Sequence, residues 1–168
     1  MVPFYKRKEV SSLPSLNAIF RNFNRAKGVC SCSDFPRQKI GCVVVEGNKV
    51  VSVGYNQAKS NPKQKQYNRY RNFRLPKKAS PLENCCHAEM MALSNLWNRK
   101  NDNWSRASIY IYRASKDGEL KLAKPCNACA KAIIDFGIGH VYYTTEGGFN
   151  HETLREFKES NKDLPIYW

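Results

Sequence analysis

Three side chains in this sequence are of types that bind a transition metal, and their spacing would let them share one ion. Cys126 and Cys129 follow Pro125 at the start of an expected helix, so both sulfurs can point at the same ion. A helix N-terminus lowers the pKa of a thiol, which favours thiolate ligands. His87 opens a second expected helix and adds an imidazole. Two thiolates and one imidazole predict a tetrahedral Zn²⁺ site with its fourth position left for water, as in catalytic zinc sites.

Glu89 would supply the proton chemistry beside such an ion. It follows His87 by two residues, so the two side chains do not share a face in the middle of a helix. At a helix start, both can still reach a common point from different sides. A carboxylate beside zinc-bound water can take its proton and pass it on. The pattern therefore predicts a nucleophile and a proton shuttle, with zinc held only for folding as the alternative.

His-x-Glu followed by Pro-Cys-x-x-Cys is the signature of zinc-dependent nucleobase deaminases. On these residues the sequence resembles the cytidine/deoxycytidylate deaminase superfamily, closest to its His-ligand branch, over about residues 40–145. The resemblance implies one catalytic Zn²⁺ at His87, Cys126 and Cys129. It also implies that Glu89 is the catalytic proton shuttle.

The resemblance extends to substrate contacts. It implies that Asn56 sits at the sugar of the substrate and that the backbone around Ala88 contacts the base. Arg113, at the end of an expected strand, is a candidate for binding a substrate phosphate. The alternative for Arg113 is an exposed charge at a strand end.

Residues 57–78 have a different character from the rest of the chain, with eight basic residues and no acidic one. Tyr67, Tyr70 and Phe73 recur at every third position within this segment. Aromatic rings between Lys and Arg suit stacking on bases, so Tyr67 and Tyr70 are candidate substrate-binding residues. The same rings could instead form the buried stripe of a short helix, or the segment could serve as a lid.

Composition narrows the class of protein. The chain has 168 residues, is 42% hydrophobic and carries a formal net charge of +14, which fits one globular domain with polyanion partners or with a charged, solubilising surface. We expect a single deaminase domain over 1–168 with a basic insertion at 57–86. Apolar runs are too short for a membrane span, and residues 1–12 lack a secretory pattern. Seven cysteines without such a signal indicate a reducing compartment, the cytoplasm, or the host cytoplasm if the protein is viral.

The remaining cysteines carry weaker signals. Cys30 and Cys32 could join a second, structural zinc, although the Cys-x-Cys spacing is poor evidence for one. Cys85 and Cys86 adjoin His87, where ordinary packing is expected, with an extra ligand or redox switch as the alternative. Cys42 lies in an expected strand and is assigned to the core.

Periodicity predicts four strands and four helices, and the resemblance implies their assembly into a three-layer α/β/α fold with a central mixed, partly parallel sheet. The unit over 108–145 predicts a right-handed crossover between parallel strands. The first helix should bury Leu16, Ile19, Phe20 and Phe23. The expected helices are 15–27 (ending at Gly28), His87–Asn98, Cys126–Phe136 and Asn150–Glu159; the expected strands are Ile40–Glu46, Val50–Tyr55, Ser108–Arg113 and Gly139–Thr145.

The function that the resemblance implies is zinc-dependent hydrolytic deamination of a cytosine nucleotide of the dCMP type, giving the uracil nucleotide and ammonia. One alternative is a polynucleotide deaminase acting on cytosine or adenine in single-stranded DNA, RNA or tRNA. Another is an inactive, zinc-stabilised nucleic-acid-binding module. The expected partners are a nucleotide or single-stranded nucleic acid and further copies of the chain in a homo-oligomer, with no membrane.

Overall fold

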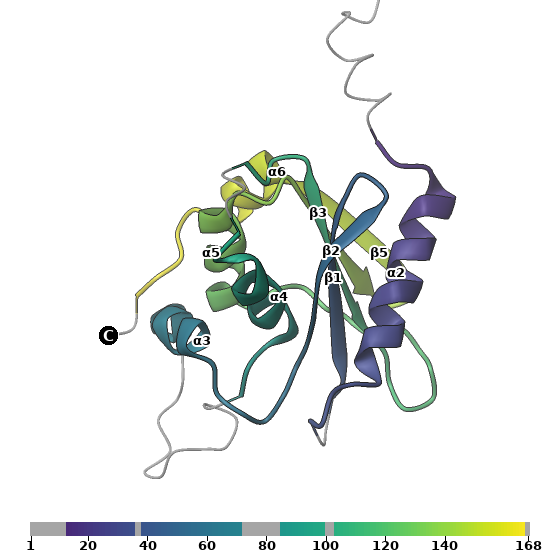
Figure 1. Cartoon of the computed structure of the whole chain (residues 1–168), viewed down its shortest axis with the longest axis horizontal. Coiled ribbons are helices and arrows are strands. Elements are labelled where there is room, and N and C mark those ends of the chain that lie inside the picture. Colours follow the sequence, from purple (N-terminus) through teal and green to yellow (C-terminus); the bar gives the residue numbers. More distant parts are fainter. Residues whose placement is uncertain (1–12, 36–37, 72–84, 100–102, 167–168) are drawn as a thin grey trace, which may run out of the picture.

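A five-stranded mixed sheet forms the centre of the molecule, in the order β2-β1-β3-β4-β5 (Figure 1). The computed structural model describes residues 13–35, 38–71, 85–99 and 103–166. Its elements are α2 (Leu16–Cys30), β1 (Ile40–Glu46), β2 (Lys49–Tyr55), α3 (Pro62–Tyr67), a 3₁₀ turn (Asn68–Tyr70), α4 (Ala88–Leu96), β3 (Ala107–Arg113), α5 (Asn127–Phe136), β4 (His140–Thr145), β5 (Gly148–Thr153) and α6 (Leu154–Ser160). Strands β3 and β4 are parallel and the other neighbouring pairs antiparallel, which confirms the predicted mixed sheet.

Helices cover both faces of this sheet, so the predicted three layers are present. Helix α2 lies on one face, and α4 and α5 lie on the other (Figure 1). Side chains alternate between the faces along each strand. Val43 and Val45 of β1 therefore pack with Ile19 of α2, whereas Cys42 and Val44 pack in the core beneath α4 and α5. In the part of the chain that the structure describes, no helix is long and apolar enough to cross a membrane.

The inner face of α2 differs from the prediction. Leu16 and Phe20 are 61% and 51% exposed rather than buried. The buried stripe keeps the expected helical spacing, but it is shifted by three residues and includes the polar Asn22, which concealed it in the sequence. The helix also continues through Gly28 instead of ending there. The buried positions are Ile19, Asn22, Phe23 and Ala26.

The expected helix over Asn150–Glu159 is wrong in its first part. Gly147, with φ at 87°, turns the chain back so that residues 148–153 form the edge strand β5. Thr153, rather than Asn150, is the N-cap of α6. Its hydroxyl accepts a hydrogen bond from the backbone N–H of Glu156, whose carboxylate accepts one from the backbone of Thr153. The short, mostly polar strand before this capping box has no apolar alternation that would reveal it.

The basic segment is helical over residues 62–70. Helix α3 and the 3₁₀ turn bring the rings of Tyr67 and Tyr70 into the core beside α5, with 5% and 8% of their surface exposed. The Tyr67 hydroxyl donates a hydrogen bond of 2.9 Å to Asp135 of α5. The two rings thus form the buried stripe that was one of the two interpretations of their spacing. Phe73, with the rest of the insertion over 72–84, lies outside the described residues.

Candidate metal centre

The structure brings His87, Cys126 and Cys129 together, as the sequence predicts. The Nδ1 atom of His87 lies 3.4 Å from the Sγ atom of each cysteine. All three ligand atoms lie within 4.8 Å of one another. Ordinary Zn–N and Zn–S bonds at tetrahedral angles would place nitrogen and sulfur about 3.6 Å apart. The donor set and its spacing therefore fit Zn²⁺.

Two helix starts position these ligands. His87 is the N-cap of α4 and Cys126 is the N-cap of α5, both with extended backbone conformations. Their carbonyls accept the first helical hydrogen bonds, from Met91 and Ala130, but neither side chain caps its helix. The imidazole and the thiol are thus available to an ion. Cys129 lies one turn into α5, on the same side as Cys126.

Protons compete with a metal for this cluster. Hydrogen bonds from the Cys129 thiol and from His87 hold the pKa of Cys126 well below its usual value. Burial disfavours a charged His87, but its hydrogen bonds to Cys126 and Cys85 outweigh that effect and raise its pKa to about 10. The cluster therefore favours a thiolate at Cys126. An entering metal must displace the protons of His87 and Cys129.

Glu89 faces the same cluster from the first turn of α4. Its side chain is 5% exposed and interacts with the Cys129 thiol by a hydrogen bond. Burial raises the pKa of Glu89, and the negative Cys126 acts in the same direction, against the opposing effect of His87. A carboxyl whose pKa is raised toward neutral pH suits general acid–base chemistry.

Helix α3 supports the metal centre through Gln64, a residue that sequence reasoning missed. The Gln64 side chain is 1% exposed, and its Oε1 atom accepts a hydrogen bond of 3.0 Å from the backbone N–H of His87. Its Nε2 atom donates to Asn68 at 2.9 Å, which fixes the orientation of the amide. A glutamine among eight basic residues gives no sequence signal for this role, because the contact spans 23 residues.

Asn56 lies just beyond β2 and is 6% exposed. Its side-chain oxygen accepts hydrogen bonds from the Ile40 backbone (2.8 Å) and the Ser33 hydroxyl (2.7 Å). Its amide nitrogen donates to the carbonyl of Gln38. The side chain therefore ties the segment before β1 to the end of β2, and the described residues leave one of its N–H groups without an acceptor. A sugar contact for Asn56 stays a prediction.

Ala88 and Arg113 lie at the same end of the sheet but in different surroundings. Ala88 is fully buried at the first position of α4. A Cβ atom on Gly54 of β2 would overlap the Ala88 carbonyl oxygen, so glycine permits this close approach. Arg113 ends β3, and its guanidinium donates a hydrogen bond of 3.1 Å to the Leu122 carbonyl. It does not belong to the metal cluster.

The other cysteines contribute no further metal cluster among the described residues, where only His87, Cys126 and Cys129 bring three such ligand atoms together. Cys86 is fully buried, and its backbone pairs with Gln57 in an isolated β-bridge. Cys85 is also buried and forms a side-chain hydrogen bond with His87. These two residues pack around the centre rather than complete it.

Comparisons with known proteins agree with this geometry. The family model described as "Cytidine and deoxycytidylate deaminase zinc-binding region" matches residues 21–145, more than half of the chain. A deoxycytidylate deaminase from Pongo abelii is 29% identical over 112 residues, which is 66% of this chain and 55% of that protein. The chain therefore spans little more than half the length of this relative.

Solved structures show the same fold. The dCMP deaminase of cyanophage S-TIM5 in its apo form superposes with a TM-score of 0.57 at 17% identity, covering 91% of this chain and 96% of the phage protein. The cytidine deaminase of Burkholderia pseudomallei gives a TM-score of 0.54 at 19% identity, covering 82% and 94%. With its His-Cys-Cys cluster and matching sequence region, this chain belongs to the cytidine and deoxycytidylate deaminase zinc-binding family.

Proposed function

We propose that the protein removes the amino group of a cytosine nucleotide of the dCMP type, giving the uracil nucleotide and ammonia. The observation that carries this proposal is the buried Glu89 carboxyl beside the His87, Cys126 and Cys129 cluster. The named relative is a deoxycytidylate deaminase, and the cyanophage enzyme has been solved in complex with dCMP and dUMP. Both names support a pyrimidine nucleotide as the substrate.

The proton transfers are assigned to Glu89. Zinc, when bound, lowers the pKa of a water toward about 7, which makes that water a nucleophile at neutral pH. Glu89 takes the proton of the attacking water and gives it to the ring nitrogen next to C4. It then takes the remaining proton from the hydroxyl group now on C4 and gives it to the amino group, which leaves as ammonia. Its burial supports this role, because a buried carboxyl holds a proton at higher pH than an exposed one.

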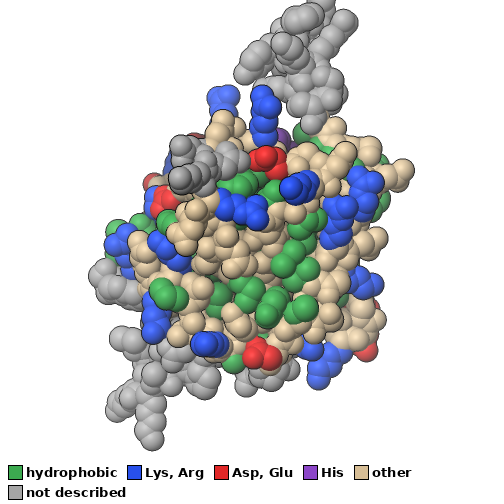
Figure 2. Space-filling view, in the orientation of Figure 1, with side chains coloured by type: hydrophobic (Ala, Val, Ile, Leu, Met, Phe, Trp, Pro, Cys, Tyr) green, Lys and Arg blue, Asp and Glu red, His purple; other side chains and the backbone are tan. Residues whose placement is uncertain are grey.

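A polynucleotide substrate is the second candidate, and the net charge of +14 favours it. Figure 2 shows Lys and Arg side chains spread over one face of the molecule, with few acidic groups between them. Against this candidate, the rings of Tyr67 and Tyr70 are buried and offer no surface on which a base could stack. We therefore propose a mononucleotide as the substrate, and the experiment below tests a single strand beside it.

Ammonia release from dCMP and from a cytosine-containing single strand, offered in parallel to the zinc-loaded protein, tests the proposal. We expect turnover of dCMP. Glu89→Ala should bind zinc at the same stoichiometry and lose about 10²–10⁴-fold in rate, the usual contribution of a positioned acid–base group. Near-native turnover by Glu89→Ala would refute the assigned role of this residue.

The outcomes separate the three candidate functions. Turnover of the strand alone, with binding that weakens steeply as salt increases, would establish the polynucleotide function. Tight binding of the strand without any product would establish the non-catalytic module. Turnover of dCMP with little dependence on salt supports the proposal.

We also propose a reducing compartment such as the cytoplasm. The supporting observation is that Cys126 and Cys129 must be reduced to bind a metal, since the thiolate is the ligand. All seven cysteines are free thiols in the structure. Exposure of the metal-free protein to oxidant should therefore abolish zinc binding, and a reductant should restore it.

A further inference from the structure

His140 and His151 form a pair of imidazoles outside the metal centre. They are two of the three histidines in the chain, and His87 is the third. His140 opens β4, and His151 lies diagonally across from it on the antiparallel strand β5. The Nδ1 atom of His140 lies 2.9 Å from the Nε2 atom of His151. The two rings of this histidine pair therefore direct a nitrogen at each other.

The histidine pair lies apart from the zinc ligands. The ring of His151 stacks on that of Tyr142, which packs in the core beneath α2. The zinc ligands lie on the opposite face of the sheet, where α4 and α5 begin. His140 follows the other end of α5, a helix whose 10 residues span about 15 Å. A ligand of the histidine pair is therefore distant from the zinc centre.

Both rings of the histidine pair are neutral at physiological pH. Burial lowers the pKa of His140 below its usual value, against the opposing effect of Glu156. Burial also lowers the pKa of His151, and the charge of His140 acts in the same direction, against the effects of Glu156 and Glu152. A neutral imidazole is the form that binds a metal ion. This pair can therefore accept an ion at pH 7 without first losing a charge.

The distance between the two nitrogens fits a metal ion that takes its ligands at right angles. Two metal–nitrogen bonds of about 2.05 Å that enclose 90° place their nitrogens about 2.9 Å apart, whereas a tetrahedral angle would separate them by about 3.3 Å. The observed separation is 2.9 Å. Square-planar or tetragonal sites made of nitrogen and oxygen are typical of Cu²⁺ and Ni²⁺. Both side chains are partly exposed, so water can supply the remaining ligands.

We propose that the histidine pair binds a divalent nickel or copper ion, as a second metal site separate from the zinc centre. Without the ion, one ring donates its N–H to the facing nitrogen of the other. When the ion binds, that proton moves to the remaining nitrogen of the same ring, and both rings turn their lone pairs toward the ion. Both rings stay neutral, so no proton is released. The negative Glu156 acts on both rings and favours a cation between them.

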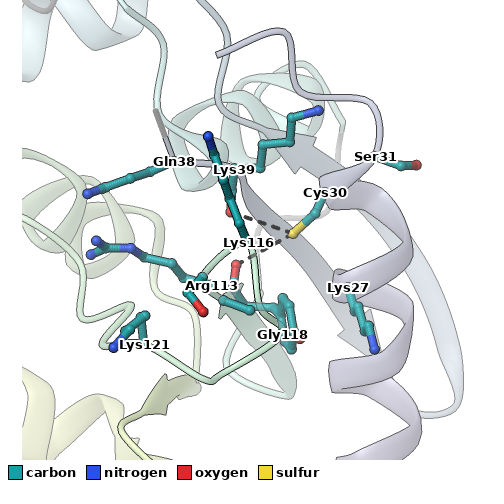
Figure 3. A pocket seen from close by; sticks show the side chains of 12 residues that line it. Lys27, Cys30, Ser31, Gln38, Lys39, Arg113, Lys116, Gly118 and Lys121 are labelled. Atoms are coloured by element: carbon teal, nitrogen blue, oxygen red, sulfur yellow. Dashed lines mark hydrogen bonds between the residues drawn. The ribbon is translucent and has the colours of Figure 1, made fainter. Parts of the chain in front are cut away.

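The Cys30 thiol is a weaker candidate for a second metal site. It lines a pocket beside the C-terminal end of α2, together with Lys27, Lys39 and Lys116 (Figure 3). Its sulfur is directed to the carbonyls of Lys39 and Tyr112, at 3.9 and 3.7 Å. Burial raises the pKa of Cys30 to about 11, so at neutral pH it is not the thiolate that binds metals. The surrounding lysines also repel a cation, which the carboxylates near the histidine pair do not.

A calorimetric titration with Ni²⁺ tests the proposal on the full-length protein loaded with one equivalent of zinc. Ni²⁺ is the probe because, unlike Cu²⁺, it does not oxidise thiols. We expect His140→Asn and His151→Asn each to weaken Ni²⁺ binding at least about tenfold, since each variant keeps only one imidazole of the pair. Cys32→Ser is the matched control, because Cys32 is an exposed thiol outside the pair and its loss should leave Ni²⁺ binding unchanged.

Amide NMR signals locate the ion in the unmodified protein, so the test does not depend on the folding of a variant. Addition of Ni²⁺ should first shift or broaden the signals of β4 and β5 around His140 and His151. The signals around Cys126 should not change at the same Ni²⁺ concentration. Excess Mg²⁺ should not displace the Ni²⁺, because Mg²⁺ prefers oxygen ligands.

Three results would overturn the proposal. The first is a failure of Ni²⁺ to bind the unmodified protein, or binding of equal affinity in either histidine variant. The second is a loss in Cys32→Ser as large as that in the histidine variants, which would assign the ion to a thiol. The third is displacement of Ni²⁺ by Mg²⁺, which would assign it to carboxylates. No measurement uses a nucleotide, so the result is independent of the proposed deaminase function.

Discussion

His87, Cys126 and Cys129 were predictable from sequence because their chemistry is carried by residue type and short spacing. Two cysteines three residues apart at a helix start lie on the same side of the helix, so both thiols can bind one ion. The structure confirms that the two thiols lie close together. The proximity of Glu89 to the same point was predictable for the same reason. The role of Gln64 was not, since its contact with His87 depends on how a polar segment folds back over 23 residues.

Zinc affinity should fall as the pH falls. The raised pKa of His87, about 10, means that its ring is protonated at neutral pH before a metal enters, and the ring must lose that proton to bind the metal. Acid stabilises the protonated cluster. For each proton that zinc must displace, the apparent zinc affinity should therefore fall about tenfold for every unit by which the pH is lowered. Competition with a chelator of known affinity between pH 6.5 and 8.5 measures this slope.

Proton release gives an independent check of that prediction. Zinc titrations in buffers of different ionisation enthalpy should report protons released into the buffer at neutral pH. A pH-independent affinity without proton release would contradict the proton-holding cluster described for His87, Cys126 and Cys129.

At the scale of elements, four of the five strands and the parallel pair follow from patterns visible in the sequence. β1 to β4 are apolar, β-branched or aromatic, and the crossover between β3 and β4 is parallel as expected. β5 escaped prediction because it is mostly polar and partly exposed, and its pairing with β4 rather than its own composition holds it in place. The stripe of α2 was misplaced because a buried asparagine interrupts its apolar pattern.

Helix α3 should be needed for full zinc affinity. Gln64→Ala removes the buried acceptor for the backbone N–H at the start of α4, and an unsatisfied buried donor costs about 1–3 kcal/mol. We expect zinc to bind roughly tenfold more weakly as His87 loses its fixed position. Gln66→Ala is the matched control, because Gln66 lies in the same helix and is exposed. Equal zinc affinities in the two variants would show that α3 does not position His87.

At the scale of the whole molecule, the metal joins two helices that the core already packs together. The cluster lies where α4 and α5 begin, and both helices cover one face of the sheet (Figure 1). An ion there would hold the two helix starts in place. The chain's large positive charge acts at the same scale, on the approach of anions rather than on the fold.

Removal of zinc should lower the melting temperature. A ligand present at 100 times its Kd stabilises the folded state by about 2.7 kcal/mol. For a chain of this size each kcal/mol shifts the melting temperature by about 2–4 °C, so chelation should cost roughly 5–10 °C. Thermal unfolding with and without a chelator measures the shift. In Cys129→Ser, the chelator should change the melting temperature very little. An unmodified protein that melts at the same temperature in both conditions would contradict a zinc ion that braces the two helices.

The separation of the metal ligands along the chain has a consequence for synthesis. His87 leaves the ribosome 39 residues before Cys126, and β4, the partner of β3, follows only after both cysteines. The two thiols can capture an ion as a local pair in the nascent chain, but the imidazole joins them only when the intervening loop closes. The order of emergence therefore places complete coordination of the ion after Cys129 has left the ribosome, late in synthesis of the chain.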